Sequence, residues 1–154
     1  MVINVYNSIK KVLSMFMGLF KHSIDSNGRV IIPSKMRDEL GKDFIITRGY
    51  DRCIYIYNRE TYEKKLEQFD DLPDTVLENR KFEREMFLYM NEANMDKNGR
   101  VMLPEMLRDM MDIKGDVYII GVRKRIEIWD TEVYKNYKAT VAPLEELANN
   151  IKRE

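Results

Sequence analysis

The apolar residues of this chain recur with two periods that alternate along the sequence. Within residues 53–57, isoleucine alternates with tyrosine, and this period of two is typical of a β-strand. Tyr62, Leu66 and Phe69 then follow at spacings of four and three, which is typical of an amphipathic helix. Asn58 stands between the two segments, where a helix N-cap is expected. The pattern therefore predicts a strand at 53–57 followed directly by a helix.

Further elements are predicted ahead of this pair. An apolar strand ends near Ile24, and the Asn27-Gly28 dipeptide that follows favours a type I′ hairpin turn, in which both central residues need positive φ. Pro33 closes the next strand, and Gly41 stands where a helix C-cap is expected. The predicted elements are a strand up to Ile24, a strand at Arg29–Ile32, a helix at Ser34–Leu40 and a strand at Phe44–Arg48.

The whole pattern then occurs a second time. Residues 25–38 match residues 96–109 at a constant offset of 71, with eight of fourteen positions identical. Farther along, the match continues at an offset of 72. In the second copy we expect a turn at Asn98-Gly99, a strand at Val101–Leu103, a helix at Glu105–Met111, strands at Val117–Val122 and Ile126–Trp129, and a helix capped by Asp130 that carries Val133, Tyr134 and Tyr137. The sequence therefore predicts an α+β protein of two tandem β-β-α-β-β-α repeats.

The remaining segments complete the expected organisation. Leu72-Pro73-Asp74 is a break, and a helix is predicted from about Thr75 to Asn91, with an apolar stripe that we interpret as core or subunit packing. The predicted divisions are an N-terminal extension at 1–14, a first repeat at 15–71, a linker helix at 72–94, a second repeat at 95–140 and a C-terminal tail at 141–154, either a short polar helix or frayed.

Composition narrows the possible chemistry. The chain has 154 residues, of which 44% are hydrophobic and 34% charged, as expected for a folded globular protein. Cys53 is the single cysteine and His22 the single histidine, so neither an internal disulfide nor a Cys/His zinc site is expected. The sequence also has no phosphate-binding loop, activated nucleophile or paired carboxylates. We therefore expect no enzyme activity, no cofactor and no metal, and a reducing cytoplasm fits the single cysteine.

The net charge first argues against nucleic acid as a partner. Lys and Arg number 26, as do Asp and Glu, whereas nucleic-acid-binding domains usually carry a basic excess. The distribution changes this picture, because residues 21–57 hold seven basic and five acidic residues while residues 58–95 hold six and ten. The first repeat is thus mildly basic, and a single subunit is expected to bind DNA weakly.

The candidate chemistry lies in a duplicated Asp-x-x-x-Arg motif across each turn. The motif comprises Asp25 and Arg29 in the first repeat and Asp96 and Arg100 in the second. A structural interpretation has each Asp accept backbone N–H groups and pair with its Arg. A functional interpretation uses the guanidinium fork on phosphate or guanine. The two interpretations are compatible, since the Asp can orient the Arg.

A second candidate group follows the proline of the first repeat. Lys35 and Arg37 stand on the short predicted helix, from which they could project near Arg29. The alternative is a solvated helix face. The second copy keeps Arg108 but has Met106 in place of Lys35, so the two copies differ chemically.

These residues resemble the MraZ family. The resemblance rests first on residues 15–37, which end in Asp-Ser-Asn-Gly-Arg-Val-Ile-Ile-Pro-Ser-Lys-Met-Arg. It rests further on Thr47-Arg48-Gly49, on residues 96–100, and on Ile120-Gly121-Val122 with residues 126–129. It covers nearly all of the chain from Met15 to about Tyr137, with both repeats in order. Many members have Lys in place of Asn27, so this first loop is less basic than theirs.

The resemblance implies a fold and a function. The implied fold is two AbrB-like units fused in one chain as a swapped-hairpin, double-split β-barrel with connecting helices. The implied function is that of a cytoplasmic, nucleoid-associated transcriptional regulator, a ring-shaped homo-oligomer that binds short direct repeats in double-stranded DNA upstream of its own operon, the division and cell-wall gene cluster. The implied DNA-binding residues are Asp25, Asn27, Gly28, Arg29, Lys35, Arg37, Asp96 and Arg100, with Arg29 the leading contact.

An alternative from a different functional class stays open. AbrB-type units also serve as antitoxin-like or scaffolding modules, so the chain could instead form an oligomeric ring that binds protein and not DNA. A membrane partner and a small-molecule substrate are not expected. Arg29, Lys35 and Arg37 on one surface would favour DNA, because a scaffold does not need such a surface.

Overall fold

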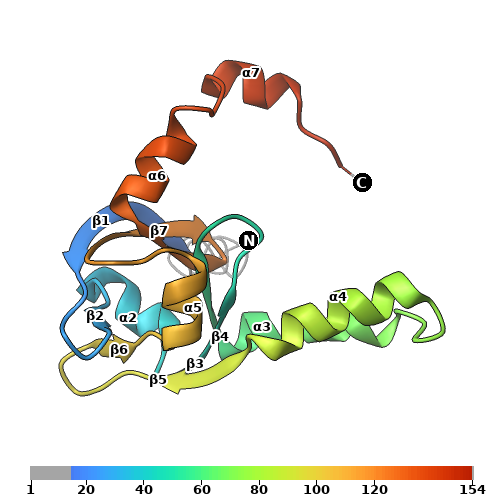
Figure 1. The fold of residues 1–154 in the computed structure, drawn as a ribbon, viewed down its shortest axis with the longest axis horizontal. Helices are drawn as coiled ribbons and strands as arrows, with labels where there is room; N and C mark the ends of the chain where they lie inside the picture. The colour runs from blue at the N-terminus through green and yellow to red at the C-terminus, as the bar shows by residue number, and fades with distance from the viewer. Residues whose placement is uncertain (1–14, 154) are drawn as a thin grey trace, which may run out of the picture.

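The computed structural model describes residues 15–153, so the predicted extension at 1–14 lies outside the described residues, as does Glu154. The first repeat comprises β1 (Phe16–Ser23), β2 (Arg29–Ile31), α2 (Ser34–Leu40), β3 (Asp43–Arg48), β4 (Ile54–Asn58) and α3 (Arg59–Asp70). After α4 (Leu77–Leu88), the second repeat comprises β5 (Asn91–Asn94), β6 (Arg100–Met102), α5 (Glu105–Met110), β7 (Asp116–Arg123), β8 (Arg125–Asp130) and α6 (Thr131–Lys138), and α7 (Leu144–Asn149) follows. The predicted β-β-α-β-β-α order is thus found twice (Figure 1).

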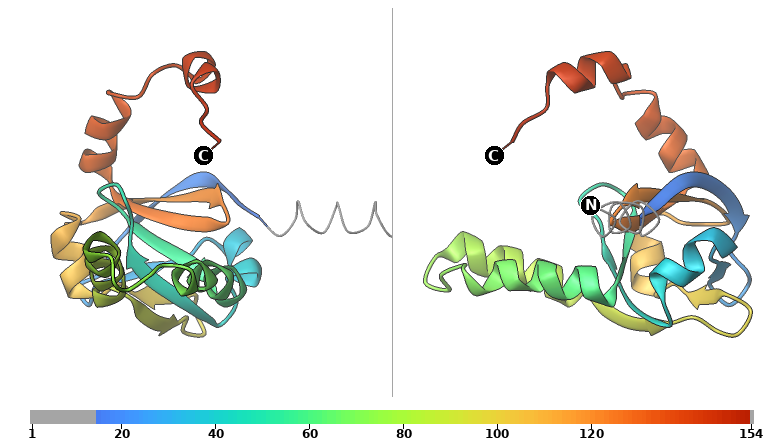
Figure 2. Two further views of the ribbon diagram at one scale, coloured as in Figure 1. Left: turned by 90° about the vertical axis from the view of Figure 1, so that its right-hand side faces the viewer. Right: turned by 180° about the vertical axis from the view of Figure 1, so that it is seen from behind.

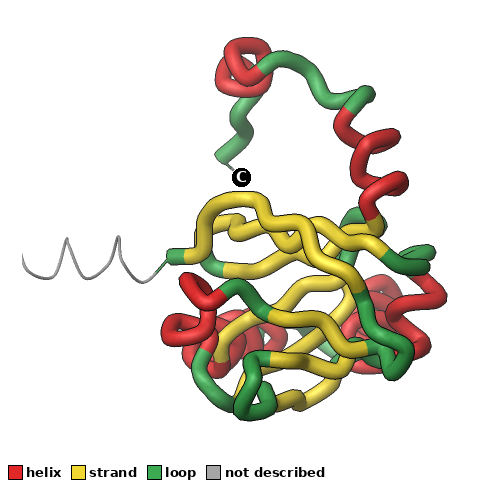
Figure 3. Tube along the Cα trace, turned by 90° about the vertical axis from the view of Figure 1, so that its left-hand side faces the viewer, coloured by secondary structure: helices red, strands yellow, loops and turns green. Residues whose placement is uncertain are grey.

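The strands form a large antiparallel sheet and a separate ribbon. The sheet has six strands in the order β1-β7-β8-β4-β3-β5, and β2 pairs with β6 in a two-stranded ribbon (Figure 3). β1 and β5 lie at opposite edges of the sheet, so the pairings among residues 15–153 leave it open and do not close it into a barrel. The protein is accordingly a mixed α+β fold.

The two repeats are interleaved about an approximate twofold axis. In β4 and β8, Tyr55 pairs with its own counterpart Glu127, and in the ribbon Val30 pairs with its own counterpart Val101. Around these pairs, β1 of the first repeat lies on β7 of the second, while β5 of the second lies on β3 of the first. Each repeat therefore completes the sheet of the other.

Both faces of the sheet are covered by apolar side chains. One face packs against the ribbon, α2 and α5 in a core that includes Phe16, Val30, Ile32, Met36, Leu40, Phe44, Ile46, Ile54, Ile56, Val101, Leu103, Leu107, Met111, Val117, Ile119, Ile126 and Ile128. The other face carries a smaller aromatic cluster with α3 and α6 against it, which includes Tyr55, Tyr57, Tyr62 and Trp129. Val30 and Val101 are almost fully buried, so the inner side of the ribbon is part of the main core.

The predicted caps are confirmed. The Asn58 side chain accepts a hydrogen bond from the Thr61 N–H at the start of α3, and that of Asp130 accepts from the Glu132 and Val133 N–H groups at the start of α6. Each cap satisfies helix N–H groups that have no partner within the helix. The duplicated cap residues therefore do the same work in both repeats.

The type I′ turn predicted at Asn27-Gly28 is wrong. Among the described residues only Asp112 and Arg123 combine a side chain with positive φ, so Asn27 does not, whereas Gly28 has a φ of 79°. The Gly28 N–H donates to the Asp25 carbonyl and the Asp25 N–H donates to the Arg29 carbonyl, which makes a three-residue loop with glycine in the left-handed position. The strand pairing also differs, because β2 leaves β1 after the turn and pairs with β6.

The helix predicted to reach Asn91 is shorter. α4 ends at Leu88, and residues 91–94 form β5, because they pair with β3 from Ile46↔Asn91 to Asp43↔Asn94. Backbone pairing with a neighbouring strand thus overrides the local helical pattern. None of the α4 residues is buried, and Phe82 stacks on Phe69 of α3, 5.6 Å between ring centroids.

Two helical extensions project from the body of the molecule. α3 and α4 form an antiparallel hairpin on one side, and α6 with α7 forms an arm on another (Figure 2). The predicted C-terminal segment is helical from Leu144 to Asn149, and Leu144, Leu147 and Ile151 are exposed on it. No helix in the described part of the chain has the length and apolar character needed to cross a bilayer.

Candidate nucleic-acid interface

Each Asp-x-x-x-Arg turn is built by its aspartate. The Asp25 Oδ1 atom accepts hydrogen bonds from the Asn27 and Arg29 backbone N–H groups, both at 2.9 Å. In the second repeat, the Asp96 Oδ1 atom accepts from Asn98 at 2.8 Å and from Arg100 at 2.9 Å. A carboxylate that binds two amides of the turn fixes the loop and explains why aspartate stands first in the motif. The structural interpretation of the motif is therefore correct for the aspartates.

The arginines are oriented by the same carboxylates. The Arg29 Nε atom donates to Asp25 Oδ2 at 3.0 Å, and the Arg100 Nε atom lies 3.9 Å from Asp96 Oδ2. Only the Nε edge of Arg29 is used in this way, and no hydrogen bond of its Nη atoms is formed within residues 15–153. The side chain of Arg29 is 33% exposed and that of Arg100 is 35% exposed. Each turn thus holds an arginine by one edge and leaves the other edge available.

The two arginines share the outer face of the β2–β6 ribbon. Val30 and Val101 point into the core, so side chains at the alternate positions point outward. On that face Arg29 lies opposite Met102 and Arg100 lies opposite Ile31, which places the arginines on one diagonal. Diagonal neighbours across an antiparallel pair are about 7–8 Å apart at their Cα atoms. The ribbon therefore presents two cations together with the exposed apolar side chains of Ile31 and Met102.

The other predicted site residues lie in different surroundings. Asn27 is exposed at the tip of the first turn, and Lys35 is exposed in the first turn of α2. Gly28 is buried. Arg37 is half-buried, and its Nε atom donates to the Ile32 carbonyl at 2.8 Å. The structure thus brings the two Asp/Arg pairs together on the ribbon, whereas Arg37 turns toward the backbone beneath it.

Sequence reasoning gave no role to Arg108. Its Nε atom donates to the Leu103 carbonyl at 3.0 Å, the counterpart of the Arg37 bond, and its guanidinium lies against Gly28 of the other repeat. The offset of 71 matches Arg108 with Arg37 in the sequence, and that match was the available signal. What was missing was the pairing of β2 with β6, which brings Arg108 under the first turn.

The turns set the acidity of their aspartates. The Arg29 backbone N–H is the main cause that holds the pKa of Asp25 below its ordinary value of 3.8, and the Arg100 N–H does the same for Asp96. The charge of Arg29 also lowers the pKa of Asp96, which places Arg29 near the second turn as well. A carboxylate with a lowered folded-state pKa stabilises the fold above its unfolded-state pKa, and this contribution is lost as pH falls through the folded-state pKa.

We expect the carboxyl carbons of Asp25 and Asp96 to titrate by NMR with midpoints below 3.8 in the folded protein. The reason is that two backbone N–H groups donate to the Oδ1 atom of each ionised carboxylate. In an Arg29→Ala variant the midpoint of Asp96 should rise, since one nearby cation is removed. Midpoints at or above 3.8 would show that these turns do not form in solution.

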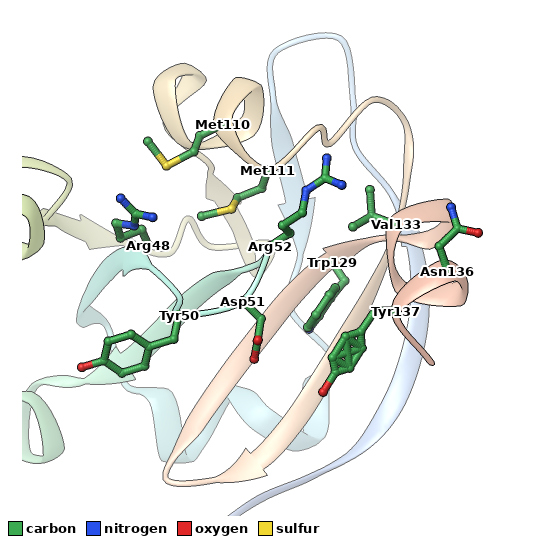
Figure 4. Close-up of a pocket in the computed structure, with 10 residues that line it drawn as sticks. All are labelled: Arg48, Tyr50, Asp51, Arg52, Met110, Met111, Trp129, Val133, Asn136 and Tyr137. Carbon is green, nitrogen blue, oxygen red and sulfur yellow. The ribbon is translucent and has the colours of Figure 1, made fainter. Parts of the chain in front are cut away.

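A hollow on another side of the molecule has a different character. It has a volume of about 600 Å³ and is lined by Arg48, Tyr50, Asp51, Arg52, Met110, Met111, Trp129, Val133, Asn136 and Tyr137 (Figure 4). Both arginines that line it are ion-paired, Arg48 with Glu85 at 2.7 Å and Arg52 with Asp112. The ribbon arginines are ion-paired as well, but they lie together on one face, whereas the hollow also contains Asp51 and is otherwise lined mainly by apolar and aromatic side chains. The ribbon is therefore the better candidate for an anionic partner.

The described residues offer little for metal or thiol chemistry. No group of three or more His, Cys, Asp or Glu residues within 15–153 is arranged to hold a metal ion. Cys53 is buried, and burial raises the pKa of its thiol far above the ordinary value. A buried, protonated thiol is unreactive.

Comparison with known proteins identifies the family. The family model described as "MraZ protein, putative antitoxin-like" matches residues 15–85 and again residues 86–153. A protein named "Transcriptional regulator MraZ" from Caldanaerobacter subterraneus subsp. tengcongensis is 41% identical over 138 residues, which cover 89% of this chain and 96% of that protein. Proteins of the same name from Natranaerobius thermophilus, at 45% identity over 80% of this chain and 87% of that protein, and from Lactiplantibacillus plantarum, at 41% over 89% and 98%, are similarly related. With both repeats matched and relatives of this identity over most of its length, the chain belongs to the MraZ family.

Proposed function

We propose that this protein is a DNA-binding transcriptional regulator that contacts double-stranded DNA with the outer face of the β2–β6 ribbon. The observation that carries the proposal is the pair of arginines, Arg29 and Arg100, each held by one edge and presented on the same face. Relatives over most of the chain are named transcriptional regulators and not enzymes, which supports the same conclusion.

The ribbon has a shape and a chemistry that suit the major groove. That groove admits a two-stranded β-ribbon, and arginine pairs there with guanine O6 and N7 while apolar side chains contact the thymine methyl group. Ile31 and Met102 lie beside the arginines on the outer face and are 42% and 50% exposed. Lys35 and Asn27 are proposed to contact phosphates at the edge of the ribbon, and the buried Gly28 to keep the turn in shape. The first repeat is proposed to lead because Met106 replaces lysine in the second.

Self-association would supply the affinity that one ribbon lacks. We propose a ring-shaped homo-oligomer, supported by exposed apolar side chains on the two projecting extensions, Leu77, Phe87 and Leu88 on α4 and Leu144, Leu147 and Ile151 on the arm. The net charge of zero makes one subunit a weak ligand for DNA. Linked subunits that engage neighbouring sites raise the effective affinity by about 10²-fold or more without any new contact.

The finer features implied by the family follow from this function. We propose that the sites are short direct repeats upstream of the protein's own operon, the division and cell-wall gene cluster, and that the protein acts in the cytoplasm at the nucleoid. We also propose that the fold corresponds to an AbrB-like swapped-hairpin, double-split barrel. The exchange of β2 onto β6, and of β1 onto β7, supports that assignment.

The test is binding of a labelled duplex from the upstream region, followed by fluorescence anisotropy at several salt concentrations. If one subunit neutralises about two phosphates, affinity should fall about tenfold between about 50 mM and about 200 mM salt, and more when several subunits engage. Light scattering in parallel reports the assembly state. An intact oligomer that binds no DNA, or binds it without salt dependence, would contradict the proposal and favour a protein-interaction function.

A further inference from the structure

The turn of each repeat is packed against an arginine of the other repeat. A Cβ atom placed on Gly28 would lie 2.7 Å from an Nη atom of Arg108, and one placed on Gly99 would lie 2.7 Å from an Nη atom of Arg37. Both glycines are buried beneath these guanidinium groups and both have a φ of 79°. Contact this close to the backbone requires a residue without a side chain. The glycine of each motif therefore serves the approach of an arginine as well as the turn.

The same arginines are anchored to the strand that follows their own turn. The Arg37 Nε atom donates to the Ile32 carbonyl at 2.8 Å, and the Ile32 N–H donates to the Gly99 carbonyl at 2.9 Å. Ile32 thus binds the arginine through its C=O group and the opposite turn through its N–H group. The second repeat repeats this arrangement, with Arg108 Nε bound to the Leu103 carbonyl at 3.0 Å and the Leu103 N–H bound to the Gly28 carbonyl at 2.9 Å.

We propose that Arg37 and Arg108 are reciprocal positioning residues, each of which holds the Asp-x-x-x-Arg turn of the opposite repeat in its DNA-binding geometry. Arg108 holds the first turn and thereby positions Arg29. Arg37 holds the second turn and thereby positions Arg100. A planar guanidinium can donate from Nε to a carbonyl while its face covers the neighbouring glycine peptide, and a lysine ammonium cannot do both. The part of this proposal that concerns DNA rests on the function proposed above, whereas the part that concerns the turns does not.

Hydrogen exchange in the DNA-free protein tests the first part through a crossed pattern. In Arg108→Lys, amide exchange should accelerate about tenfold or more at residues 25–29 of the first repeat and much less at 96–100. In Arg37→Lys the pattern should reverse. Lys35→Ala, a change on the exposed side of α2, is the matched control and should leave both turns unchanged. Loss of global stability would accelerate amide exchange at both turns together. The measured quantity is therefore the difference in exchange rate between the two turns.

DNA binding tests the second part through its salt dependence. Both lysine variants keep the charge, and they should lower affinity about tenfold while leaving the slope of log affinity against log salt unchanged, because no phosphate contact is removed. Arg37→Ala and Arg108→Ala complete the test, because loss of a direct phosphate contact at either position would instead lower that slope by about one. Equal exchange at both turns in each lysine variant, or acceleration in the arginine's own repeat, would overturn the proposal even if the wild-type protein binds DNA. If the crossed pattern is found and the wild-type protein does not bind DNA, the positioning role stands and the proposed function fails.

Discussion

Replacing Arg29 and Arg100 together with alanine is expected to abolish DNA binding while leaving the fold and the proposed oligomer intact. The Arg29 guanidinium is hydrogen-bonded through Nε to Asp25, and that of Arg100 lies 3.9 Å from Asp96. Each turn itself is closed by backbone groups that the substitution keeps. An arginine in bidentate contact with a base contributes about 1–3 kcal/mol, or about 5-fold to 150-fold in affinity. If the two losses multiply, the double variant should therefore lose at least about 25-fold in affinity per subunit in anisotropy measurements.

The single variants and a control make this result specific. Arg29→Ala should weaken binding more than Arg100→Ala, because the first repeat also carries Lys35 where the second has Met106. Arg84→Ala removes the same charge from the exposed surface of α4, away from the ribbon, and should bind nearly as the unmodified chain does. If Arg29→Ala dissociates the proposed oligomer or unfolds the chain, the arginine has a structural role. The result would then contradict the proposal that the ribbon binds DNA through Arg29.

The largest loss of stability is expected from Gly121→Ala. Gly121 of β7 faces Gly18 of β1, and a Cβ atom there would lie 2.6 Å from Cα and closer still to the backbone N of Met17. The clash is with backbone, which cannot rotate away as a side chain can, so β1 has to separate from β7. The free energy of unfolding should fall by about 3 kcal/mol or more. Thermal unfolding should shift down by about 6–12 °C in a domain of this size.

Gly115→Ala is the matched control for this substitution. Gly115 precedes β7, and a Cβ atom added there meets no atom within 4 Å. Its effect on the free energy of unfolding should stay below about 1 kcal/mol in either direction. Comparable losses in the two variants would mean that the β1–β7 pairing is not the part of the fold that Gly121 protects.

Local sequence signals were sufficient for most of the elements, β5 excepted, but not for the pairing of the strands. Asn58 and Asp130 cap helices as predicted, because a cap needs only a side-chain oxygen and the amides two or three residues ahead. Gly41 donates its N–H to the Arg37 carbonyl at the end of α2, as its position suggested. By contrast, the turn at 25–29 predicted pairing of β1 with β2. In the structure β2 pairs instead with β6, a chemically similar strand about 70 residues farther along. Local sequence carries no information about a partner at that distance.

The candidate site was predictable to the same extent. The Asp25/Arg29 contact spans four residues and could be inferred from turn chemistry, and it is present at 3.0 Å. The environment of Arg37 depends on Gly99 of the other repeat, so the position of its side chain could not be derived from α2 alone. The strand at 91–94, where the predicted helix ends and the division named the linker helix continues, could not be derived for a similar reason, since its pairing with β3 crosses the two repeats.

The interleaving of the two repeats also governs how the protein can be made. When the first repeat has left the ribosome, β1 lacks β7, β2 lacks β6, β3 lacks β5 and β4 lacks β8, so all four of its strands have open edges. Unpaired strand edges and exposed apolar faces favour aggregation during synthesis. The native sheet can be completed only after β8 is translated. The nascent chain therefore lacks its native sheet for most of its synthesis. If the chain were cut between α4 and β5, we would expect the two fragments to fold only when they associate with each other.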